Sequence, residues 1–330
     1  MGEFSKKIGE YGEEIVADFL KMIGWEPISN FDISCKYQEE HLPSKKRIEA
    51  EILSSETPEK KAKLRQTHGI DFAYTYENPL INNTRENVLI SSKFSKDEYP
   101  KTPKGKSSKF KDYVEDLTFA LECFMKDKLR NEFIGDKRYN KVSDIGLLFW
   151  LNNTNENPDV IQELYNSRLP SRYKFEAIYL VDNKRIGFIY DSIQYVKFSF
   201  QNEEEKIKPN WYFVYFLTGK NSSQHSPKEG KILPIQLLTT KILPFKIVKE
   251  NGTVLALTVM DSFSEESFSK ILGLARDIAV SFQGKTYIAF PDYNKLEHEN
   301  SVNKIKRLYN NSLFTKNVVV DNFYLQRLNK

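Results

Sequence analysis

Two apolar segments of the sequence, residues 70–76 and 88–94, each contain polar side chains that could carry chemistry. Asp71 interrupts the first segment, while Ser91 and Lys93 stand two residues apart in the second. A carboxylate is a hard oxygen ligand of the kind Mg²⁺ prefers, and a nearby amine can stabilise negative charge on a phosphate. The pattern indicates metal-assisted phosphodiester hydrolysis, unless these polar residues are simply the solvent face of a half-buried sheet.

A further candidate acid lies on the helix predicted from about residue 5 to 23. At 100° per residue, Glu13 lies about 60° from the centre of the apolar stripe, whereas Glu14 lies about 160° away. Glu13 is therefore predicted to flank the buried face. The interior glycines Gly9 and Gly12 lower helix propensity, which suggests that they allow close approach to another element.

The elements around these residues follow a simple order. After the helix the sequence predicts three strands, a second helix and a strand buried on both faces, and a charged insertion at 36–67, expected to be partly helical, separates the first two strands. The predicted strands cover 25–34, 70–76, 87–94 and 145–151, and the second helix covers 108–130.

This order and three short motifs resemble the PD-(D/E)XK nuclease superfamily. The motifs are Gly9-Glu10-Tyr11-Gly12-Glu13, Gly69-Ile70-Asp71 and Ser91-Ser92-Lys93. The resemblance implies an α/β fold with a restriction-endonuclease-like core. It further implies that Glu13, Asp71 and the backbone carbonyl of Ser92 bind Mg²⁺, which Mn²⁺ can replace, and that Lys93 orients the attacking water and stabilises the transition state.

Ser91 departs from the motif of that superfamily, because it stands where an acid or Gln is expected. It contributes a hydroxyl group without charge. Two carboxylates can still hold Mg²⁺, which keeps much of its water shell, but more weakly. Among possible replacement acids, Glu86 is predicted to face away from Lys93, which leaves Asp116 or Glu115 on the following helix.

A lysine-rich stretch at 100–111 follows the strand that carries Lys93, and it contains no acid. We interpret this stretch as a loop that contacts DNA phosphates; a solvated loop is the alternative. The candidate phosphate contacts are Lys101, Lys104, Lys106, Lys109 and Lys111.

The segments HGIDFAYTYENPL and ISSKFS, with the lysine-rich stretch, also resemble the nuclease-like subunit of a two-gene anti-phage defence system. This resemblance implies a protein partner encoded by a neighbouring gene. It also makes His68 a candidate site residue, although a single histidine beside a strand more often has a packing role.

The chain of 330 residues is long enough for two domains. We place a nuclease-like domain at 1–151, a linker at 152–172 and a mixed α+β domain at 173–330. The second domain shows no catalytic spacing and is assigned by exclusion to partner binding or regulation. Its aromatic residues, such as Trp211-Tyr212-Phe213, indicate a sheet core, with a base-stacking surface as the alternative.

Within the second domain, the sequence predicts seven strands, then a helix and a final strand. The strands cover 175–181, 185–190, 194–200, 211–217, 232–238, 243–248 and 253–260, the helix covers 265–282 with a capping box at Ser262 and Glu265, and the final strand covers 286–290.

Composition narrows the location and the cofactors. The net charge of +4 is mild, so DNA binding must depend on local clusters of charge. Two cysteines without a CxxC pair and four scattered histidines predict no structural metal site. No apolar run is long enough for a membrane span and no signal peptide is evident, so we expect a cytoplasmic protein.

Together these patterns favour a Mg²⁺-dependent DNA endonuclease in defence against phage or other foreign DNA. A homodimer is a candidate assembly of this enzyme. The alternative is a catalytically inactive DNA-binding or scaffold subunit that keeps the nuclease fold, with Ser91 in place of the missing acid.

Overall fold

The structure is a computed structural model, and its chain divides into two compact units, Met1–Lys184 and Arg185–Lys330. The structure describes residues 2–42, 64–154, 158–201, 209–216, 228–250, 252–280, 282–309 and 311–324. Most of the predicted insertion, residues 43–63, lies outside the described residues, and so does the helical content predicted for it.

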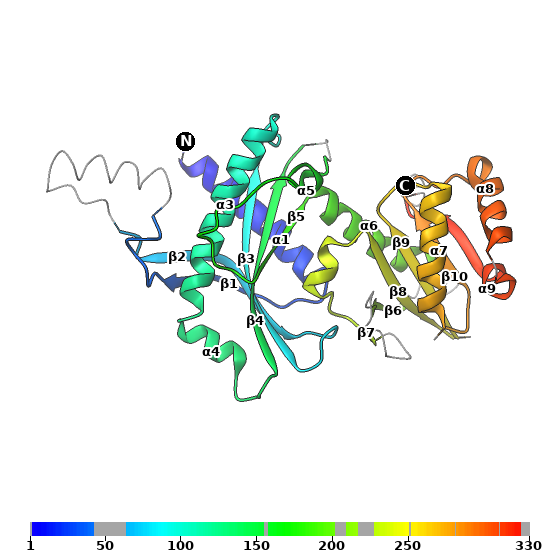
Figure 1. The fold of residues 1–330 in the computed structure, drawn as a ribbon, viewed down its shortest axis with the longest axis horizontal. Helices are drawn as coiled ribbons and strands as arrows, with labels where there is room; N and C mark the ends of the chain where they lie inside the picture. Colours follow the sequence, from blue (N-terminus) through cyan, green and yellow to red (C-terminus); the bar gives the residue numbers. More distant parts are fainter. Residues whose placement is uncertain are drawn as a thin grey trace, which may run out of the picture. The chain divides into compact units, whose positions relative to one another are not determined.

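The first unit is built on a five-stranded mixed sheet with strand order β1-β2-β3-β4-β5 (Figure 1). The first three strands are antiparallel neighbours, whereas β3, β4 and β5 run parallel. The strands are β1 (Ile28–Ser34), β2 (Thr67–Glu77), β3 (Thr84–Ser95), β4 (Lys141–Asn152) and β5 (Ala177–Asp182). The helices are α1 (Gly2–Met22), α3 (Pro103–Phe124), α4 (Lys128–Ile134) and α5 (Val160–Glu163).

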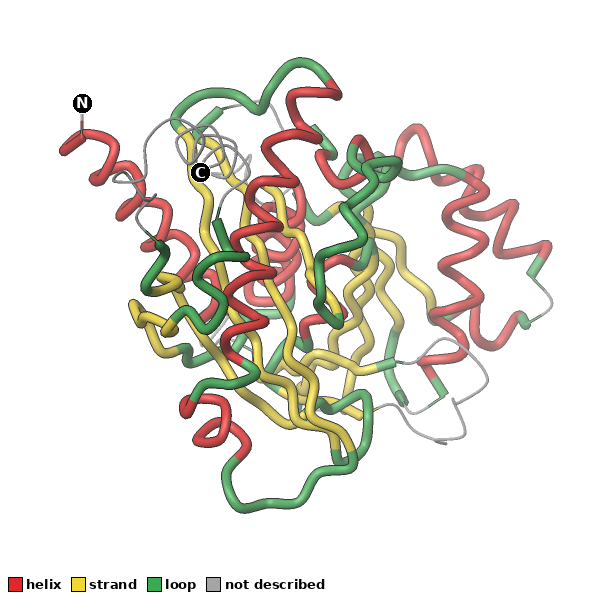
Figure 2. Tube along the Cα trace, turned by 60° about the vertical axis from the view of Figure 1, so that its left-hand side comes forward, coloured by secondary structure: helices red, strands yellow, loops and turns green. Residues whose placement is uncertain are grey.

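Helices α1 and α3 cover opposite faces of this sheet (Figures 1 and 2). A Cβ added to Gly12 of α1 would lie 2.3 Å from Cβ of Phe94 on β3, so only glycine permits this approach. On the other face, Leu117 of α3 packs on Gly146 of β4. Gly9 has no such neighbour within 4 Å, so the predicted close approach holds for Gly12 and not for Gly9.

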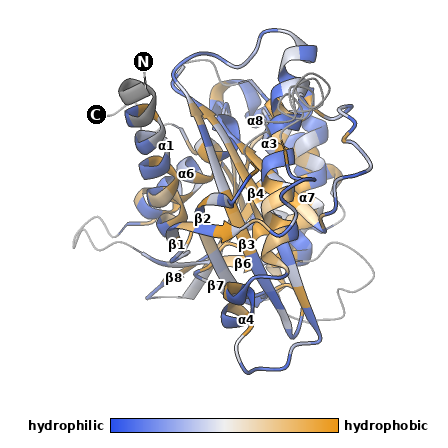
Figure 3. Cartoon of the chain, turned by 90° about the vertical axis from the view of Figure 1, so that its left-hand side faces the viewer, coloured by the Kyte–Doolittle hydropathy of each residue, from blue (hydrophilic) through white to orange (hydrophobic). Residues whose placement is uncertain are grey.

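Strand β4 is a continuous apolar run because helices cover both faces of the sheet at this strand. Residues 145 and 147–152 of β4 are all buried. The hydrophobic colouring gathers along the central strands, and the surface loops are hydrophilic (Figure 3).

The second unit contains a six-stranded mixed sheet with strand order β11-β10-β9-β8-β6-β7. Helix α7 packs on one face through an apolar core, while Ser192 of α6 meets Thr258 of β9 from the other, at 2.7 Å between their hydroxyl oxygens. The strands are β6 (Asn210–Tyr215), β7 (Lys228–Gly230), β8 (Ile242–Lys249), β9 (Gly252–Val259), β10 (Thr286–Phe290) and β11 (Val318–Asn322). The helices are α6 (Asn183–Ser199), η1 (Ile235–Thr239), α7 (Glu265–Ala279), α8 (Lys295–Leu308) and α9 (Ser312–Lys316).

The two strands predicted at 185–190 and 194–200 are wrong, because helix α6 spans both. Its buried apolar residues Phe188, Ile189, Ile193 and Val196 recur at helical spacing, which their aromatic and β-branched character obscured. The strand predicted at 232–238 is also wrong, because the short 3₁₀ helix η1 covers most of that range. This helix begins after Pro234. Helix α7 is capped by Ser264, not by the predicted Ser262.

The boundary between the units lies later than the predicted linker at 152–172. Val160, within that range, is buried in the first core, and strand β5 pairs with β4 beyond it. The first unit therefore ends at Lys184 rather than at residue 151. No helix within the described part of the chain has both the length and the apolar character needed to cross a membrane.

Candidate functional site

Strands β2 and β3 separate at the point where the candidate residues lie. Their ladder ends at the pair Phe72 and Ile90, although both strands continue, and β3 stays paired with β4 as far as Ser95. In the gap, Oδ2 of Asp71 accepts the backbone N–H of Ser92 at 2.6 Å. The carboxylate thus takes the place of a ladder partner, which fixes its position at the opening of the sheet.

The direction of the side chains along β2 also changes at Asp71. Ile70 and Ala73 both belong to the core beneath α3, although residues three apart face opposite sides of a regular strand. The alternation must therefore break between them, at Asp71 and Phe72. This irregularity frees the acid from the packed face of the sheet and leaves it half-buried.

Helix α1 brings Glu13 to the same place. Glu13 is half-buried while Glu14 is exposed, as the predicted helical phase requires. Burial raises the pKa of Glu13, the negative charges of Asp71 and Glu10 raise it further, and Lys93 lowers it. Glu13, Asp71 and Lys93 are thus close enough to interact electrostatically, and the two acids repel each other.

On the side of the sheet beneath α3, Ser91 and Lys93 line a cavity of ≈ 190 Å³. The cavity is also lined by Arg65, His68 and Asp116. The lysine ammonium lies 5.9 Å from the centre of the Tyr113 ring, and among the described residues it forms no ion pair. The amine therefore remains available to an anionic group that enters the cavity.

The acids considered as replacements at Ser91 differ in their surroundings. Asp116 lines the cavity, where it pairs with Arg65 at 3.1 Å. Glu115 is buried and bound to Arg172, so it is already neutralised. The position of Asp116 makes it the better-placed of the two.

Glu86 is directed elsewhere, as the strand parity predicted. Its carboxylate accepts hydrogen bonds from the hydroxyl of Tyr76 at 2.5 Å and from the amide of Asn78 at 2.7 Å. These bonds lie at the other end of the β2–β3 ladder, so Glu86 does not belong to the site.

The oxygen atoms at the strand separation suit a small divalent cation. Two carboxylates, those of Glu13 and Asp71, are near each other, and a cation between them would relieve the repulsion that raises the pKa of Glu13. Oγ of Ser92 is buried and has no hydrogen-bond partner in the described part of the chain. This hydroxyl is an oxygen donor that the sequence interpretation did not name; an all-oxygen set of this kind fits Mg²⁺ or Mn²⁺.

The lysine-rich stretch is not a loop, because α3 begins at Pro103, where Thr102 caps the helix by accepting the N–H of Gly105. The Pro at the first helical position and the capping threonine account for the early start. Lys101 pairs with Glu98 at 3.4 Å, and Lys106 is buried in an ion pair with Glu163.

The other three lysines of the set, Lys104, Lys109 and Lys111, form no ion pair with any described residue. They lie on the first three turns of α3. Only these three are therefore free to contact an anionic backbone without breaking an existing ion pair.

A second cluster of side chains was not predicted. Cys35, His41, His68 and Cys123 are all buried, and their ligand atoms lie within 4.8 Å of one another. Burial lowers the pKa of His68 to about 3, so its imidazole is neutral at neutral pH. The spacing along the chain hides the cluster, and the one available signal is that it uses both cysteines and two of the four histidines of the sequence.

Comparison with known proteins identifies the first unit. A search of curated proteins gives no match to this chain. A family model, described as the GAPS4 protein PD-(D/E)XK nuclease domain, matches residues 1–185 and confirms the predicted restriction-endonuclease-like fold. Since the match covers more than half of its residues, the chain belongs to the family of GAPS4 PD-(D/E)XK nuclease domains.

Proposed function

We propose that this protein is a Mg²⁺-dependent DNA endonuclease that acts in the cytoplasm against phage or other foreign DNA. The observation that carries the proposal is the meeting of Glu13, Asp71 and Lys93 where β2 and β3 separate. Family membership supports the nuclease chemistry, and the resemblance to a two-gene system supports the defence role.

In this proposal Glu13 and Asp71 hold the metal ion, with the carbonyl or hydroxyl oxygen of Ser92 as a neutral ligand. The ion would supply positive charge to the scissile phosphate and to the attacking oxygen. Lys93 stabilises the charge that develops on the phosphate and orients the water. Ser91 and Asp116 line the cavity beside Lys93, where Asp116 supplies the acid that the motif lacks at position 91.

One observation favours the second candidate function, a DNA-binding or scaffold subunit without cleavage. Ser91 is buried and offers only a hydroxyl group where the superfamily motif has an acid. A site with one carboxylate fewer binds a metal ion more weakly, so cleavage depends on whether Asp116 compensates.

The decisive experiment measures cleavage of plasmid and phage DNA by the purified protein, alone and with the partner encoded by a neighbouring gene. We expect nicking or cutting with Mg²⁺ or Mn²⁺ and none in metal-free buffer. Asp71→Asn and Lys93→Ala should each lower the rate by at least ~10²-fold, because each removes charge that the transition state needs.

Asp71→Asn is the informative substitution, because the amide oxygen can still accept the N–H of Ser92 while the negative charge is lost. Glu13→Ala should weaken cleavage, whereas Glu14→Ala should leave it unchanged, because Glu14 lies about 100° further round the helix and is exposed. DNA binding without any metal-dependent cleavage, with the partner present, would select the scaffold function instead. Full activity of Asp71→Asn would remove Asp71 from the metal site.

A further inference from the structure

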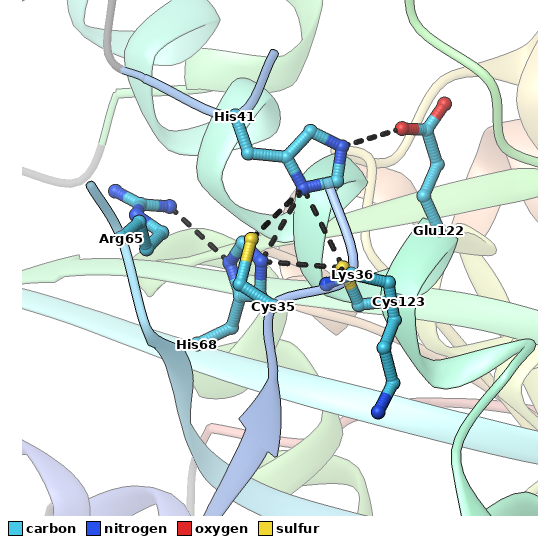
Figure 4. Close-up of polar contacts among 7 residues, drawn as sticks. All are labelled: Cys35, Lys36, His41, Arg65, His68, Glu122 and Cys123. Carbon is cyan, nitrogen blue, oxygen red and sulfur yellow. Dashed lines mark hydrogen bonds and ion pairs between the residues drawn. The ribbon is translucent and has the colours of Figure 1, made fainter. Parts of the chain in front are cut away.

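Four buried side chains, from β2, α3 and the segment that follows β1, meet beside β2 (Figure 4). Cys35 follows β1, His41 lies in the segment after it, His68 is on β2, and Cys123 is in the last turn of α3. In Figure 4 the two sulfur atoms and one nitrogen of each imidazole point toward a common centre. All four residues are at most 6% exposed, so water has little access to that centre.

The distances within the cluster have the values expected around a tetrahedral zinc ion. Zn–S bonds of about 2.3 Å and Zn–N bonds of about 2.0–2.1 Å place two nitrogens roughly 3.4 Å apart and a nitrogen and a sulfur roughly 3.6 Å apart. Nδ1 of His41 lies 3.4 Å from Nε2 of His68, 3.7 Å from Sγ of Cys35 and 3.5 Å from Sγ of Cys123. Nε2 of His68 lies 3.4 Å from Sγ of Cys123.

Hydrogen bonds alone do not account for this arrangement. A neutral imidazole nitrogen has one lone pair or one proton, so Nδ1 of His41 can make one good hydrogen bond. Three polar atoms, from Cys35, Cys123 and His68, nevertheless converge on it within 3.7 Å. A cation at the common centre satisfies all four ligand atoms at once, whereas a disulfide between the cysteines would leave the two imidazole nitrogens facing each other.

The surroundings also have the features that support metal ligands. Nε2 of His41 lies 2.8 Å from a carboxylate oxygen of Glu122, the partner that typically fixes the tautomer of a metal-bound histidine. The backbone N–H of Lys36 donates to Sγ of Cys123 at 3.2 Å, which stabilises negative charge on sulfur. The ring of Phe119 stacks on His41 with 4.3 Å between ring centres and closes one side.

Arg65 is the one neighbour that does not suit metal binding as it stands. Its guanidinium lies 3.3 Å from Nδ1 of His68, which carries the proton once Nε2 binds a metal. Two donors then face each other, so this contact is not a hydrogen bond in the metal-bound form. Arg65 retains its ion pair with Asp116 at 3.1 Å.

We propose that Cys35, His41, His68 and Cys123 bind one Zn²⁺ in a closed, structural site. Two thiolates and two imidazoles in tetrahedral arrangement are the ligand set that selects zinc among common divalent ions. Four protein ligands leave no open position for water or substrate, so this ion has no catalytic role. It is distinct from the ion proposed at Glu13 and Asp71, which has oxygen ligands.

The zinc site would join the end of β1, the start of β2 and the end of α3. His41 and His68 bracket residues 43–63, so the ion would join the two ends of that insertion. His68 precedes Asp71 by three residues on β2, and His68 also lines the cavity that contains Lys93. The ion therefore holds in place the strand that carries a proposed catalytic acid, and it acts on cleavage only through that position.

Zinc content of the full-length protein tests the proposal directly. The protein should be expressed with a zinc supplement, purified without a metal-affinity column and passed through metal-free buffer, which removes weakly bound Mg²⁺ but not zinc held by thiolates. We expect about one zinc ion per chain by elemental analysis. Fewer than about 0.2 zinc ions per chain, or a Cys35–Cys123 disulfide found by mass spectrometry, would overturn the proposal.

A spectroscopic measurement on the unaltered protein covers the case in which variants fail to fold. Protein produced with Co²⁺ should show the intense visible absorption of tetrahedral cobalt and a sulfur-to-cobalt charge-transfer band in the near ultraviolet. A weak spectrum typical of octahedral cobalt would contradict the assigned ligands.

Substitutions then assign the ligands. Cys123→Ser and His41→Asn should each lose at least about four-fifths of the zinc, whereas His298→Asn, a histidine of the second unit, should retain all of it. Asp71→Asn should also retain its zinc while losing cleavage, which separates this site from the catalytic one. Unchanged zinc content in Cys123→Ser would place the ion elsewhere in the chain.

Discussion

At the scale of single residues, the site depends on half-buried acids that form no ion pair with another described residue. Asp71 combines a structural contact, its hydrogen bond with the N–H of Ser92, with a charge that the contact does not neutralise. Glu13 is held near that charge by the close packing of Gly12 on Phe94. The sequence analysis proposed both acids from their motifs, and the predicted helix phase agrees with the half-buried position of Glu13.

The raised pKa of Glu13 leads to a prediction on stability and pH. The pKa of Glu13 in the folded state is above its usual value of 4.5, so the protonated carboxyl stabilises the fold when the pH is below 4.5. This contribution is lost as the pH rises through the pKa of the folded state. Without Mg²⁺, Glu13→Gln should therefore be at least as stable as the unaltered protein at pH 7. The difference should disappear at pH 4, as thermal unfolding at the two pH values would reveal.

The same measurement reports on metal binding. Millimolar Mg²⁺ should raise the Tm of the unaltered protein and of the control Glu14→Gln, because an ion that binds only the folded state stabilises it. It should not raise the Tm of Glu13→Gln to the same extent, and this variant should have lost most of its cleavage activity. An equal Mg²⁺ response in Glu13→Gln would show that Glu13 is not a ligand.

At the scale of elements, the separation of β2 from β3 and the start of α3 decide what can reach the cavity. The ladder between the two strands ends at Phe72 and Ile90, so the next residues of β2 and β3 do not pair with each other. Helix α3 begins directly after the loop that follows β3, so its first turns project from the same end of the sheet. Its lysines are therefore near the site because of topology and not because of a flexible loop.

The free lysines of α3 are expected to set the salt dependence of DNA binding. Lys104, Lys109 and Lys111 should be replaced together by Gln, while Lys106 is kept because it is buried in its pair with Glu163. Each lost phosphate contact should reduce the slope of log K against log salt by about 0.9 on duplex DNA, equally for all sequences.

A matched control removes the same charge elsewhere. Lys128, Lys285 and Lys316 are exposed, and replacing them by Gln changes the net charge by the same amount. Binding isotherms at several salt concentrations should show a reduced slope for the α3 variant only. Equal slopes for both variants would mean that α3 does not contact DNA, and the aromatic strands of the second unit would be the next surface to test.

The elements also show what sequence reasoning can and cannot reach. Strand 286–290 was predicted with its observed bounds, since a short apolar run between polar segments has few alternatives. Helix α6 was predicted as two strands because its residue types outweighed its spacing. The Cys–His cluster was not predicted because its members are spread from residue 35 to residue 123 and meet only when β1, β2 and α3 are packed.

At the scale of the whole molecule, each unit has a core of its own, and the proposed chemistry lies entirely in the first. The core beneath α3 includes Leu117 and Trp150, and the core beneath α7 includes Phe268 and Ile288. Trp211 and Phe213 of β6 form an aromatic group with Phe245 of β8, in which Phe213 and Phe245 are fully buried, as expected of a sheet core. We therefore keep the second unit as the candidate for binding the protein partner that we propose.

This division predicts that the two roles can be separated by truncation. A chain that ends at Lys184 retains Asn183, whose side chain bonds Asn152 and Tyr99 within the first unit. It should fold cooperatively, hold one zinc ion and cleave DNA with Mg²⁺ at the rate that the full chain shows without its partner. The fragment 185–330 should co-purify with the partner, and the shorter N-terminal chain should not.

Co-expression of each fragment with the neighbouring gene, followed by affinity purification, measures this directly. The cleavage rate of the N-terminal chain should not change when the partner is added, because this chain lacks the residues proposed to bind the partner. The cleavage rate of the full chain should change. Co-purification of the partner with residues 1–184 would instead assign the interaction to the nuclease unit. The second unit would then need another role, and DNA binding through its exposed surface would be the first to examine, by comparing the affinity of the full and truncated chains for the same duplex.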